Sequence, residues 1–570
     1  MSNSEKSRLA EFREEIDPIV FWVGAIISFV FVVGYVLAPT NAGPKGNQNW
    51  VAWAMTAVNN WLWSSLSWYY LVAMFIFVAF SAYLMFGPWG KIKIGGEDAT
   101  PRHSFFTFFA MFFSAGIAAG IDFWGPAESI YHYGYGTPLA TGSNPSTHTL
   151  MVNSLVYSFF HWGISAWCAY LIIAIPVAYY AYNKGAPFRL STLLAPFIGL
   201  DNLKNNKWAK LVDIIAVFAT LGGVATSLGL VGQELLSGIQ YNFSSVGHIP
   251  KLWSFAAIAG LTIIFTISVI SGVERGIKRI SQVNVMLFLV LGVATFLLGF
   301  PFFVLNIGTE ALGTYLNQFI HLSFFTGAGM TQALHGAAGK GLSVQGYVGG
   351  WTVFYWAWWF SWAPFSGIFL ARISKGRTIR EIAFTGVVAT TLSTIPWFMV
   401  LGGTSMKLQQ LGMANILGAV GKYGKAVSGY PLFGALPLGP LWMLLFFVLV
   451  ITFFVTSADS STLSVAMLTT GGKEHPSSSN RLFWGVVQGV IAGLLVYIGG
   501  TTSLQQAAII TGGPVAIVGL IGIWGLIKTF SAEFGHVLVQ EDADFTGDDS
   551  MLRTLITAEA RSPEGTTEDD

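Results

Sequence analysis

Twelve windows of about 20 or more mostly apolar residues dominate this sequence of 570 residues. A helix needs about 20 apolar residues to cross the hydrocarbon core of a bilayer. The windows lie at about 19–39, 66–88, 104–134, 149–182, 210–240, 252–272, 281–305, 345–374, 380–403, 437–470, 482–500 and 507–530. Only 10% of the residues are charged, far fewer than in a soluble domain. The sequence therefore predicts an all-α, polytopic membrane protein with twelve transmembrane helices.

Two parts of the chain lie outside these windows. Residues 306–344 are too polar to cross a membrane but carry apolar residues at helical spacing, so we expect an interfacial helix there. Residues 531–570 are acidic and poor in aromatic residues, which is typical of a solvated tail and compatible with a regulatory one. We divide the chain into a cytoplasmic segment 1–18, a transmembrane domain 19–530 and an acidic cytoplasmic tail 531–570.

The distribution of Lys and Arg predicts the orientation. If the windows cross the membrane in turn, 23 of the 29 basic residues lie at the two termini and in the loops after even-numbered spans. Cytoplasmic loops retain such an excess of positive charge, so we expect both termini in the cytoplasm. The formal net charge of +1 speaks against nucleic acid as a partner.

The third window contains FSAGIAAGIDFWGPAE, in which glycines and a proline crowd one membrane helix. A helix broken at such a place exposes backbone carbonyls, which are tolerated only where they line a cavity or a ligand site. Small residues at this spacing also let helices pack closely, so the glycines alone do not distinguish a ligand site from close packing. Asp122 favours a functional role, because an intramembrane carboxylate normally faces a partner, an ion or a cavity.

The eighth window, WTVFYWAWWFSWAPFSGIF, holds a cluster of tryptophans in its middle. Membrane tryptophans normally gather at the two interfaces instead. On a helix Trp358, Trp359 and Trp362 share a face, whereas Trp356 points elsewhere. Clustered indole faces attract a bulky, permanently charged cation such as trimethylammonium, which cannot donate a hydrogen bond. Tight aromatic packing between helices is the alternative.

A second aromatic set, HWGISAWCAY, lies in the fourth window. Its Trp162, Trp167 and Tyr170 line the same cavity if the fourth and eighth spans meet. His161 beside them is expected to be a hydrogen-bonded core histidine, because no second metal ligand follows at a suitable spacing.

The tenth window contains TFFVTSADSSTLS, a dense run of side chains that carry oxygen. Such oxygens suit a hard monovalent cation, by the logic that gives oxygen ligands to hard divalent ones. Ser and Thr hydroxyls also bond back to the carbonyls of their own helix, and this alternative stays open.

Together these segments resemble the betaine/choline/carnitine transporter (BCCT) family. WAWWFSWAPF followed by GIFLARISKGRTIREI is similar to the family's signature span and the loop after it, and the resemblance extends from the first span through the twelfth. It implies a LeuT-like inverted repeat of five plus five helices behind two extra helices, with repeat one at about 104–305 and repeat two at about 345–530. It also implies a multi-pass protein of the cell membrane that forms homotrimers.

The resemblance implies an aromatic box that binds the substrate. The box falls on Trp162, Trp167, Tyr170 and Trp359, with Trp356, Trp358 and Trp362 lining the pathway. A sodium site falls on Ser114, Ile117, Phe453, Thr456 and Ser457.

Two departures from the family pattern concern the coupling ion. At a second sodium site Thr220 and Phe365 match, but Val224 stands where the family has a threonine and cannot coordinate a cation. Asp122 stands where the sodium-betaine pattern is apolar. This aspartate is a proton carrier, a counter-charge for a cationic substrate or a hydrogen-bonded structural acid.

The resemblance implies a symporter that imports a quaternary-ammonium solute, such as glycine betaine or choline, by alternating access. Sodium or protons would drive it, and no cofactor beyond sodium is implied. The alternatives are a sodium-independent exchanger of the carnitine type and a non-transporting membrane enzyme or osmosensor. An enzyme is not expected, because the sequence shows no catalytic constellation. The sequence also contains no GxxxxGK[ST] loop, which speaks against primary active transport.

Overall fold

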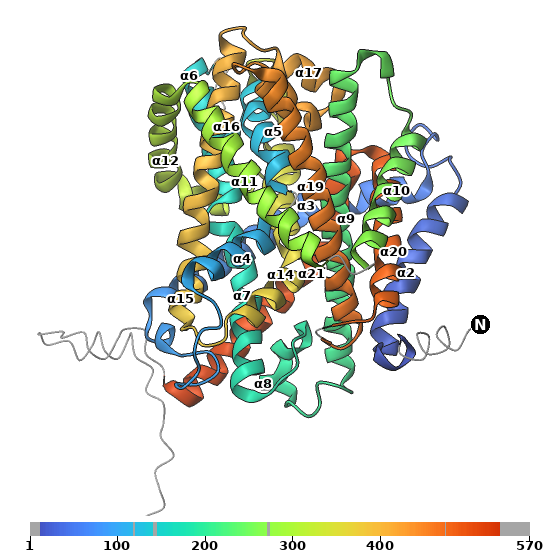
Figure 1. Ribbon diagram of the computed structural model, residues 1–570, viewed down its shortest axis with the longest axis vertical. Helices are drawn as coiled ribbons and strands as arrows, with labels where there is room; N and C mark the ends of the chain where they lie inside the picture. Colours follow the sequence, from blue (N-terminus) through green and yellow to red (C-terminus); the bar gives the residue numbers. More distant parts are fainter. Residues whose placement is uncertain (1–11, 118–119, 141–144, 271–273, 474, 536–570) are drawn as a thin grey trace, which may run out of the picture.

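The computed structural model describes residues 12–117, 120–140, 145–270, 274–473 and 475–535, and most of these residues are helical (Figure 1). The long helices are α2 (Pro18–Leu37), α3 (Trp50–Phe86), α4 (Phe105–Ile117), α5 (Gly120–Tyr135), α6 (Thr147–Trp162), α7 (Ile164–Lys184), α9 (Lys207–Asn242), α10 (Lys251–Ile270), α11 (Glu274–Leu298), α12 (Pro301–Phe324), α14 (Phe354–Ile373), α16 (Thr390–Gln410), α19 (Gly439–Thr469), α20 (Ser478–Gly499) and α21 (Thr501–Phe534). The shorter elements are η3 (Leu190–Leu194), α8 (Ala195–Ile198), α13 (Val344–Tyr347), η5 (Val348–Val353), α15 (Ile379–Phe384), η6 (Thr385–Ala389), α17 (Ile416–Tyr423), η7 (Lys425–Val427), α18 (Gly429–Gly434) and the strands β1 (Ala333–Gly336) and β2 (Gly339–Ser343).

Polar residues at the helix starts explain several of these boundaries. The side chain of Asp17 accepts a hydrogen bond from the backbone amide of Val20 in the first turn of α2, and Asn49 and Asn206 cap α3 and α9 in the same way. Such caps satisfy amides that have no partner inside the helix. At the other end of α7, Gly185 adopts a left-handed conformation that glycine favours and stops the helix.

The lengths and apolar surfaces of the helices suit a membrane. Within the described ranges, eight helical stretches are long and apolar enough to cross one, or nine if the bent pair Gln282–Leu298 and Pro301–Phe324 is one span. Large apolar side chains point outward, as on α2, where Trp22 and Phe29 are 54% and 67% exposed. This surface suits lipid rather than water. A helical multi-pass membrane protein is therefore confirmed, and the count of twelve spans stays a prediction.

Each predicted window falls on helical structure, but several windows contain more than one helix, among them the seventh, which covers the end of α11 and the start of α12. The third consists of α4 and α5; positions 118–119 between them lie outside the described residues. The fourth consists of α6 and α7, which meet at Gly163, where the Cβ of any other residue would come within 2.5 Å of the Phe159 carbonyl oxygen. The eighth and ninth windows are helical throughout, with a π-helical segment in each, η5 and η6.

The interfacial helix predicted over 306–344 is wrong for the second half of that range. α12 is helical only through Phe324, at an angle of 105° to α11, and residues 333–343 form the β1–β2 hairpin. Glycines explain the difference, because Gly327, Gly329 and Gly339 have positive φ angles that a helix cannot contain. The hairpin packs against α5.

The centre of the molecule is the crossing of α7 and α14. Every residue of α7 from Ser165 to Tyr180 is buried, and α14 packs against α7, α9 and α21. In Figure 1, α2, α10 and α20 lie on one side of the molecule and α12 on the opposite side. The aromatic residues singled out above all lie at this crossing or next to it.

Candidate functional site

Four aromatic side chains meet where α6, α7 and α14 come together. Trp162 ends α6, Trp167 and Tyr170 lie on the first turns of α7, and Trp359 lies on α14. The ring centroids of Trp162 and Trp359 are 5.1 Å apart, those of Tyr170 and Trp359 are 5.7 Å apart, and those of Trp167 and Tyr170 are 6.0 Å apart. All four side chains are buried. We call these four residues the aromatic box.

Hydrogen bonds anchor the polar edges of three rings of the aromatic box. The indole N–H of Trp162 donates to Glu128 at 2.7 Å, and that of Trp359 donates to the backbone carbonyl of His161 at 3.0 Å. The hydroxyl of Tyr170 donates to the Gly116 carbonyl at 2.9 Å. A ring held by its polar edge presents its electron-rich face, which is the surface that attracts an organic cation.

The glycines of the third window let α4 and α5 approach the rings. A Cβ on Gly120 would lie 2.6 Å from Trp358 and 3.2 Å from Trp162, and a Cβ on Gly116 would overlap Trp167. The close-packing interpretation of this segment therefore has support. The interpretation as a broken helix stays a prediction, because positions 118–119 lie outside the described residues.

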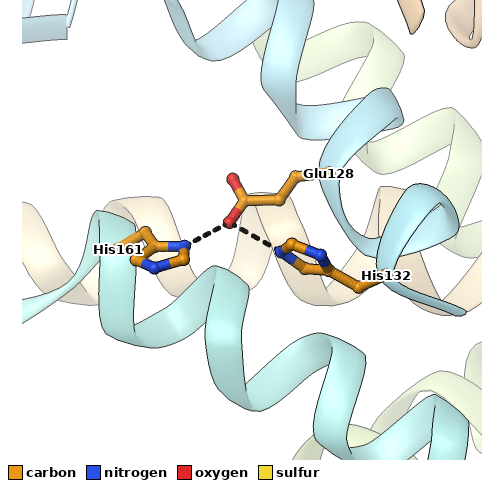
Figure 2. Close-up of side chains that lie close together, drawn as sticks. All are labelled: Glu128, His132 and His161. Carbon is orange, nitrogen blue, oxygen red and sulfur yellow. Dashed lines mark hydrogen bonds and ion pairs between the residues drawn. The ribbon is translucent and has the colours of Figure 1, made fainter. Parts of the chain in front are cut away.

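Glu128 forms the polar centre behind the aromatic box. Figure 2 shows it converging with His132 from the same helix and with His161 from another. One carboxylate oxygen accepts hydrogen bonds from His161 at 2.7 Å and His132 at 3.3 Å. The other accepts from Trp162 at 2.7 Å and from Tyr355 at 2.5 Å. Four donors around one buried carboxyl group are the environment that a carboxylate requires.

The same three side chains have the composition of a metal site, since their ligand atoms all lie within 4.8 Å of one another. Two ligands about 2.0–2.1 Å from a tetrahedral zinc ion would be roughly 3.3 Å apart. The 2.7 Å separation between His161 and Glu128 is instead that of a hydrogen bond. In this arrangement the cluster therefore orients Trp162, and His161 is the hydrogen-bonded core histidine that the sequence predicts.

The remaining tryptophans of α14 divide as their helical spacing predicts. Trp358 and Trp362 both donate to the backbone carbonyl of Gly223 on α9, at 3.3 and 3.1 Å. Trp356 packs against Phe160 and His161 on α6, at 5.0 and 5.9 Å between ring centroids. Its role on a transport pathway stays a prediction.

The sodium-site residues are described only in part. Ser114 and Ile117 end α4 and Ser457 lies in α19, but the side chains of all three lie outside the described residues. The hydroxyl of Thr456 bonds back to the carbonyls of Thr452 and Phe453, both at 3.1 Å, and accepts from Asn284 at 3.1 Å. The back-bonding alternative therefore describes Thr456 in this arrangement, and sodium binding stays a prediction.

Comparison with known proteins shows the family. Residues 19–535 match the BCCT family, described as betaine/carnitine/choline family transporters. The chain is 36% identical over 530 residues to the glycine betaine transporter OpuD of Bacillus subtilis, which covers 92% of this chain and 96% of that protein. It is also 36% identical over 476 residues to glycine betaine transporter 1 of Vibrio parahaemolyticus, covering 82% and 86%. This chain belongs to the betaine/carnitine/choline transporter family.

The resemblance inferred from the tryptophan-rich span is thus confirmed for this BCCT chain. Among solved structures, one described as the substrate-bound outward-open state of a Na+-coupled sialic acid symporter is similar over 81% of this chain and 86% of that one, with 16% identity and a TM-score of 0.40.

A cavity of about 260 Å³ lies at the end of the molecule that carries the basic loops. Its lining includes Arg102, Arg372, Phe365, Phe369 and Leu468, from the segment before α4 and from α14 and α19. At the other end, the β1–β2 hairpin and η7 pack on α5. Phe365 of the predicted second sodium site thus faces this cavity, while the hydroxyl of Thr220 is buried without a hydrogen-bond partner among the described residues.

Asp122 is fully buried on α5, and its Oδ1 accepts a hydrogen bond from the amide of Phe123 at 3.0 Å. It interacts electrostatically with Glu234 on α9, which is also buried. Glu234 is not among the predicted site residues, although a lone acid in an otherwise apolar span is a detectable signal. The contact between Tyr355 and Glu128 was not predicted either, because it depends on the packing of two spans that are far apart in the sequence.

Proposed function

We propose that this protein is a secondary transporter that imports a quaternary-ammonium solute of the glycine betaine type. The single observation that supports this function best is the aromatic box, in which four buried rings from three helices gather, three of them with their polar edges already bonded. A trimethylammonium group needs such ring faces in place of its water. The relatives named as glycine betaine transporters favour the same substrate class.

Glu128 strengthens this proposal through Trp162. A carboxylate that accepts the indole N–H draws that proton toward itself and increases the electron density of the ring. The negative charge lies behind the ring, so it attracts a cation without forming a direct ion pair that would require desolvating both partners. The site therefore suits a permanent cation better than a neutral solute of the same size.

The helix contacts support the proposed inverted repeat. If α4–α5 corresponds to α14, α7 to α16, α9 to α19, α10 to α20 and α11 to α21, then contacts in one half should recur in the other. The packing of α5 on α16 corresponds to that of α14 on α7, and the packing of α9 on α21 corresponds to that of α19 on α11. α10 packs against α20, its own counterpart. We propose five plus five helices on this basis, preceded by α2 and α3.

Alternating access follows from this proposal together with the cavity. The cavity lies beside Arg102 and Arg372, in loops that the charge distribution assigns to the cytoplasm. With the opposite end covered by the hairpin, the arrangement corresponds to a state that faces the cytoplasm. The proposal places both termini on that side and the protein in the cell membrane. The homotrimer implied by the resemblance belongs to the same proposal.

The test is uptake into liposomes that contain the purified full-length protein. Labelled glycine betaine and labelled choline are offered with a sodium gradient, a proton gradient or neither. Accumulation that requires one gradient supports a symporter and identifies the ion. Counterflow that needs no gradient would favour a sodium-independent exchanger. Absence of both accumulation and counterflow for every trimethylammonium compound would overturn the proposed function.

A further inference from the structure

Two buried acids on neighbouring helices each have an oxygen that lacks a hydrogen-bond partner. Asp122 on α5 is 0% exposed and Glu234 on α9 is 1% exposed. Among the described residues, nothing bonds to Asp122 Oδ2 or to Glu234 Oε2. α5 packs against α9, and the two carboxyl groups interact electrostatically. Buried polar atoms without partners are rare and costly, so this pair needs an explanation.

Tyr430 on α18 completes the cluster. Its ring packs so tightly on α9 that a Cβ on Gly238 would overlap it. Gly238 lies four residues after Glu234 on the same face of the helix, so the phenol adjoins the Glu234 side chain. The Tyr430 hydroxyl also has no hydrogen-bond partner within the described chain, and the ring interacts electrostatically with both acids.

The basic groups on the packed elements are engaged elsewhere. The amine of Lys425 in η7 lies 4.3 Å from the Tyr131 ring centroid and 4.4 Å from that of Trp351, and the charge of Glu128 acts on it. His132 on α5 is bonded to Glu128. Elsewhere on these elements, Lys422, Lys407 and Arg372 contact Tyr423, Gln410 and Met467, and Arg189 pairs with Asp213 at the far end of α9.

We propose that Asp122 and Glu234 form a proton-binding pair that takes up and releases a proton during transport. This inference rests on the proposed function and identifies the coupling ion. Two adjacent ionised carboxyl groups in a membrane interior repel each other, and each pays for lost hydration. One proton bound by the pair neutralises one carboxyl group and removes the repulsion.

A proton fits this cluster better than a sodium ion. Hard cations in proteins take about six oxygen ligands. In the part of the chain that the structure describes, the cluster offers three unpartnered oxygens, those of Asp122, Glu234 and Tyr430. The side chain of Asp459 on α19, which packs against α9, lies outside the described residues. Three oxygens suffice for a shared proton and leave a sodium ion half-coordinated.

The position of the pair links it to the aromatic box. Asp122 lies two residues after Gly120, and Gly120 is in contact distance of Trp358 and Trp162. α5 thus carries both the glycine that packs on the rings and one member of the pair. A displacement of α5 that opens the aromatic box also changes the hydration of Asp122, which is how binding of the solute and of the proton become coupled.

The test measures proton movement together with solute movement. Full-length protein is placed in liposomes that contain a pH-sensitive dye, and labelled glycine betaine is added outside. In the wild type, uptake is expected to carry protons inward. In Asp122→Asn and Glu234→Gln, proton flux and uphill accumulation are expected to fall by at least about tenfold, while gradient-free counterflow stays within about twofold. The double variant is expected to be no worse than either single one, because one proton is shared.

Two further variants keep the result specific. Glu310→Gln removes an exposed carboxylate on α12 and is expected to change nothing. Glu234→Asp keeps a carboxyl group and is expected to keep proton flux, which separates loss of the proton site from a failure to fold.

The outcomes separate this inference from the proposed function. Proton flux that persists in both Asp122→Asn and Glu234→Gln would overturn the pair, as would sodium flux that is lost in them, since the cluster would then be a cation site. Betaine counterflow without proton flux in the wild type would also overturn the pair, but it would leave the transporter assignment standing. Absence of betaine binding and counterflow in the wild type would instead remove the proposed function itself.

Discussion

Two buried carboxyl groups of the same helix, Glu128 and Asp122, have opposite surroundings. Glu128 accepts hydrogen bonds from four side chains, and both of its oxygens are used. Asp122 has one bond to a neighbouring amide, and its other oxygen has no partner among the described residues. A fully bonded charge is fixed in one protonation state and one geometry, whereas an unpartnered carboxyl group beside another acid can change both.

Two residues six positions apart on α5 thus have different roles. Glu128 holds its neighbours in place, whereas Asp122 can change its protonation state. The region around Glu128 holds the rings of the aromatic box in place, so changes there are expected to reduce stability and substrate affinity. The region around Asp122 is expected to tolerate loss of charge with little loss of stability, because the side-chain oxygen of Asn can still accept the hydrogen bond from the Phe123 amide. The predictions below test that division in order of decreasing effect.

Glu128→Ala is expected to have the largest effect. It leaves His132, His161, Trp162 and Tyr355 without their shared acceptor, and breaking a buried network of this kind costs about 3–5 kcal/mol. Thermal unfolding of the purified protein in detergent measures the loss. The matched control is Glu310→Ala, which removes an exposed carboxylate. If Glu128→Ala unfolds at the same temperature as Glu310→Ala, the four hydrogen bonds to Glu128 contribute little to stability.

Trp359→Ala is expected to abolish measurable betaine binding while leaving the protein folded. The substitution removes a ring that contacts both Trp162 and Tyr170, and a desolvated cation–π contact is worth about 2 kcal/mol or more, roughly a 30-fold loss of affinity for this contact alone. Tryptophan fluorescence titration reports the affinity. Trp22→Ala, on the outward side of α2, is the control and should bind normally. Unchanged affinity in Trp359→Ala would refute the assignment of the aromatic box.

Gly120→Ala is expected to reduce affinity and stability to a smaller extent. The new methyl group would lie 2.6 Å from Trp358, and overpacking of this kind costs about 1–3 kcal/mol. The control is Gly260→Ala in α10, where no neighbouring atom lies within 4 Å, and a helical alanine there is expected to be neutral or stabilising. Equal behaviour of the two variants in unfolding and binding would mean that the rings move aside at little cost.

These residues also show how far the sequence predicts the molecule. Helical spacing predicted a shared face for Trp358, Trp359 and Trp362, and Trp358 and Trp362 do share one against α9. Trp359 instead faces α6, on which Trp356 also packs. The length and apolarity of the windows likewise predicted the helices. The partners of Glu128 and the pairing of Asp122 with Glu234 could not be predicted in this way, because they depend on which helices cross and at what depth.

The same limit explains the wrong prediction over 306–344. Apolar residues at helical spacing occur there, but a few glycines redirect the chain into a hairpin, and its stability comes from packing on α5. Local pattern predicts an element where hydrophobic burial and backbone preference agree. Where they disagree, contacts between distant segments determine the local structure, and these contacts cannot be inferred from a local pattern in one sequence.

Lys425 provides the smallest expected effect and a test of the outer end. It lies in η7, outside the membrane-spanning helices, and burial against the rings of Tyr131 and Trp351 lowers its pKa to about 8, an effect that the charge of Glu128 opposes. The unfolded chain, with a pKa near 10.4, binds more protons than the folded one between pH 8 and 10. Stability is therefore expected to rise with pH across this window.

The rise is expected to be modest, about 1 kcal/mol, because Lys425 is only partly buried and solvent screens its charge. Thermal unfolding at pH 7.5, 8.5 and 9.5 measures it, and Lys425→Met should remove it. Lys422→Met is the matched control, since Lys422 is exposed, lies three residues away and contacts only one described ring, that of Tyr423. A pH dependence that survives in Lys425→Met would assign it to another group. A pH dependence that disappears in Lys425→Met would assign it to Lys425. The titration of Lys425 would then change the stability of the protein, whereas that of the Asp122 and Glu234 pair is expected to change proton movement.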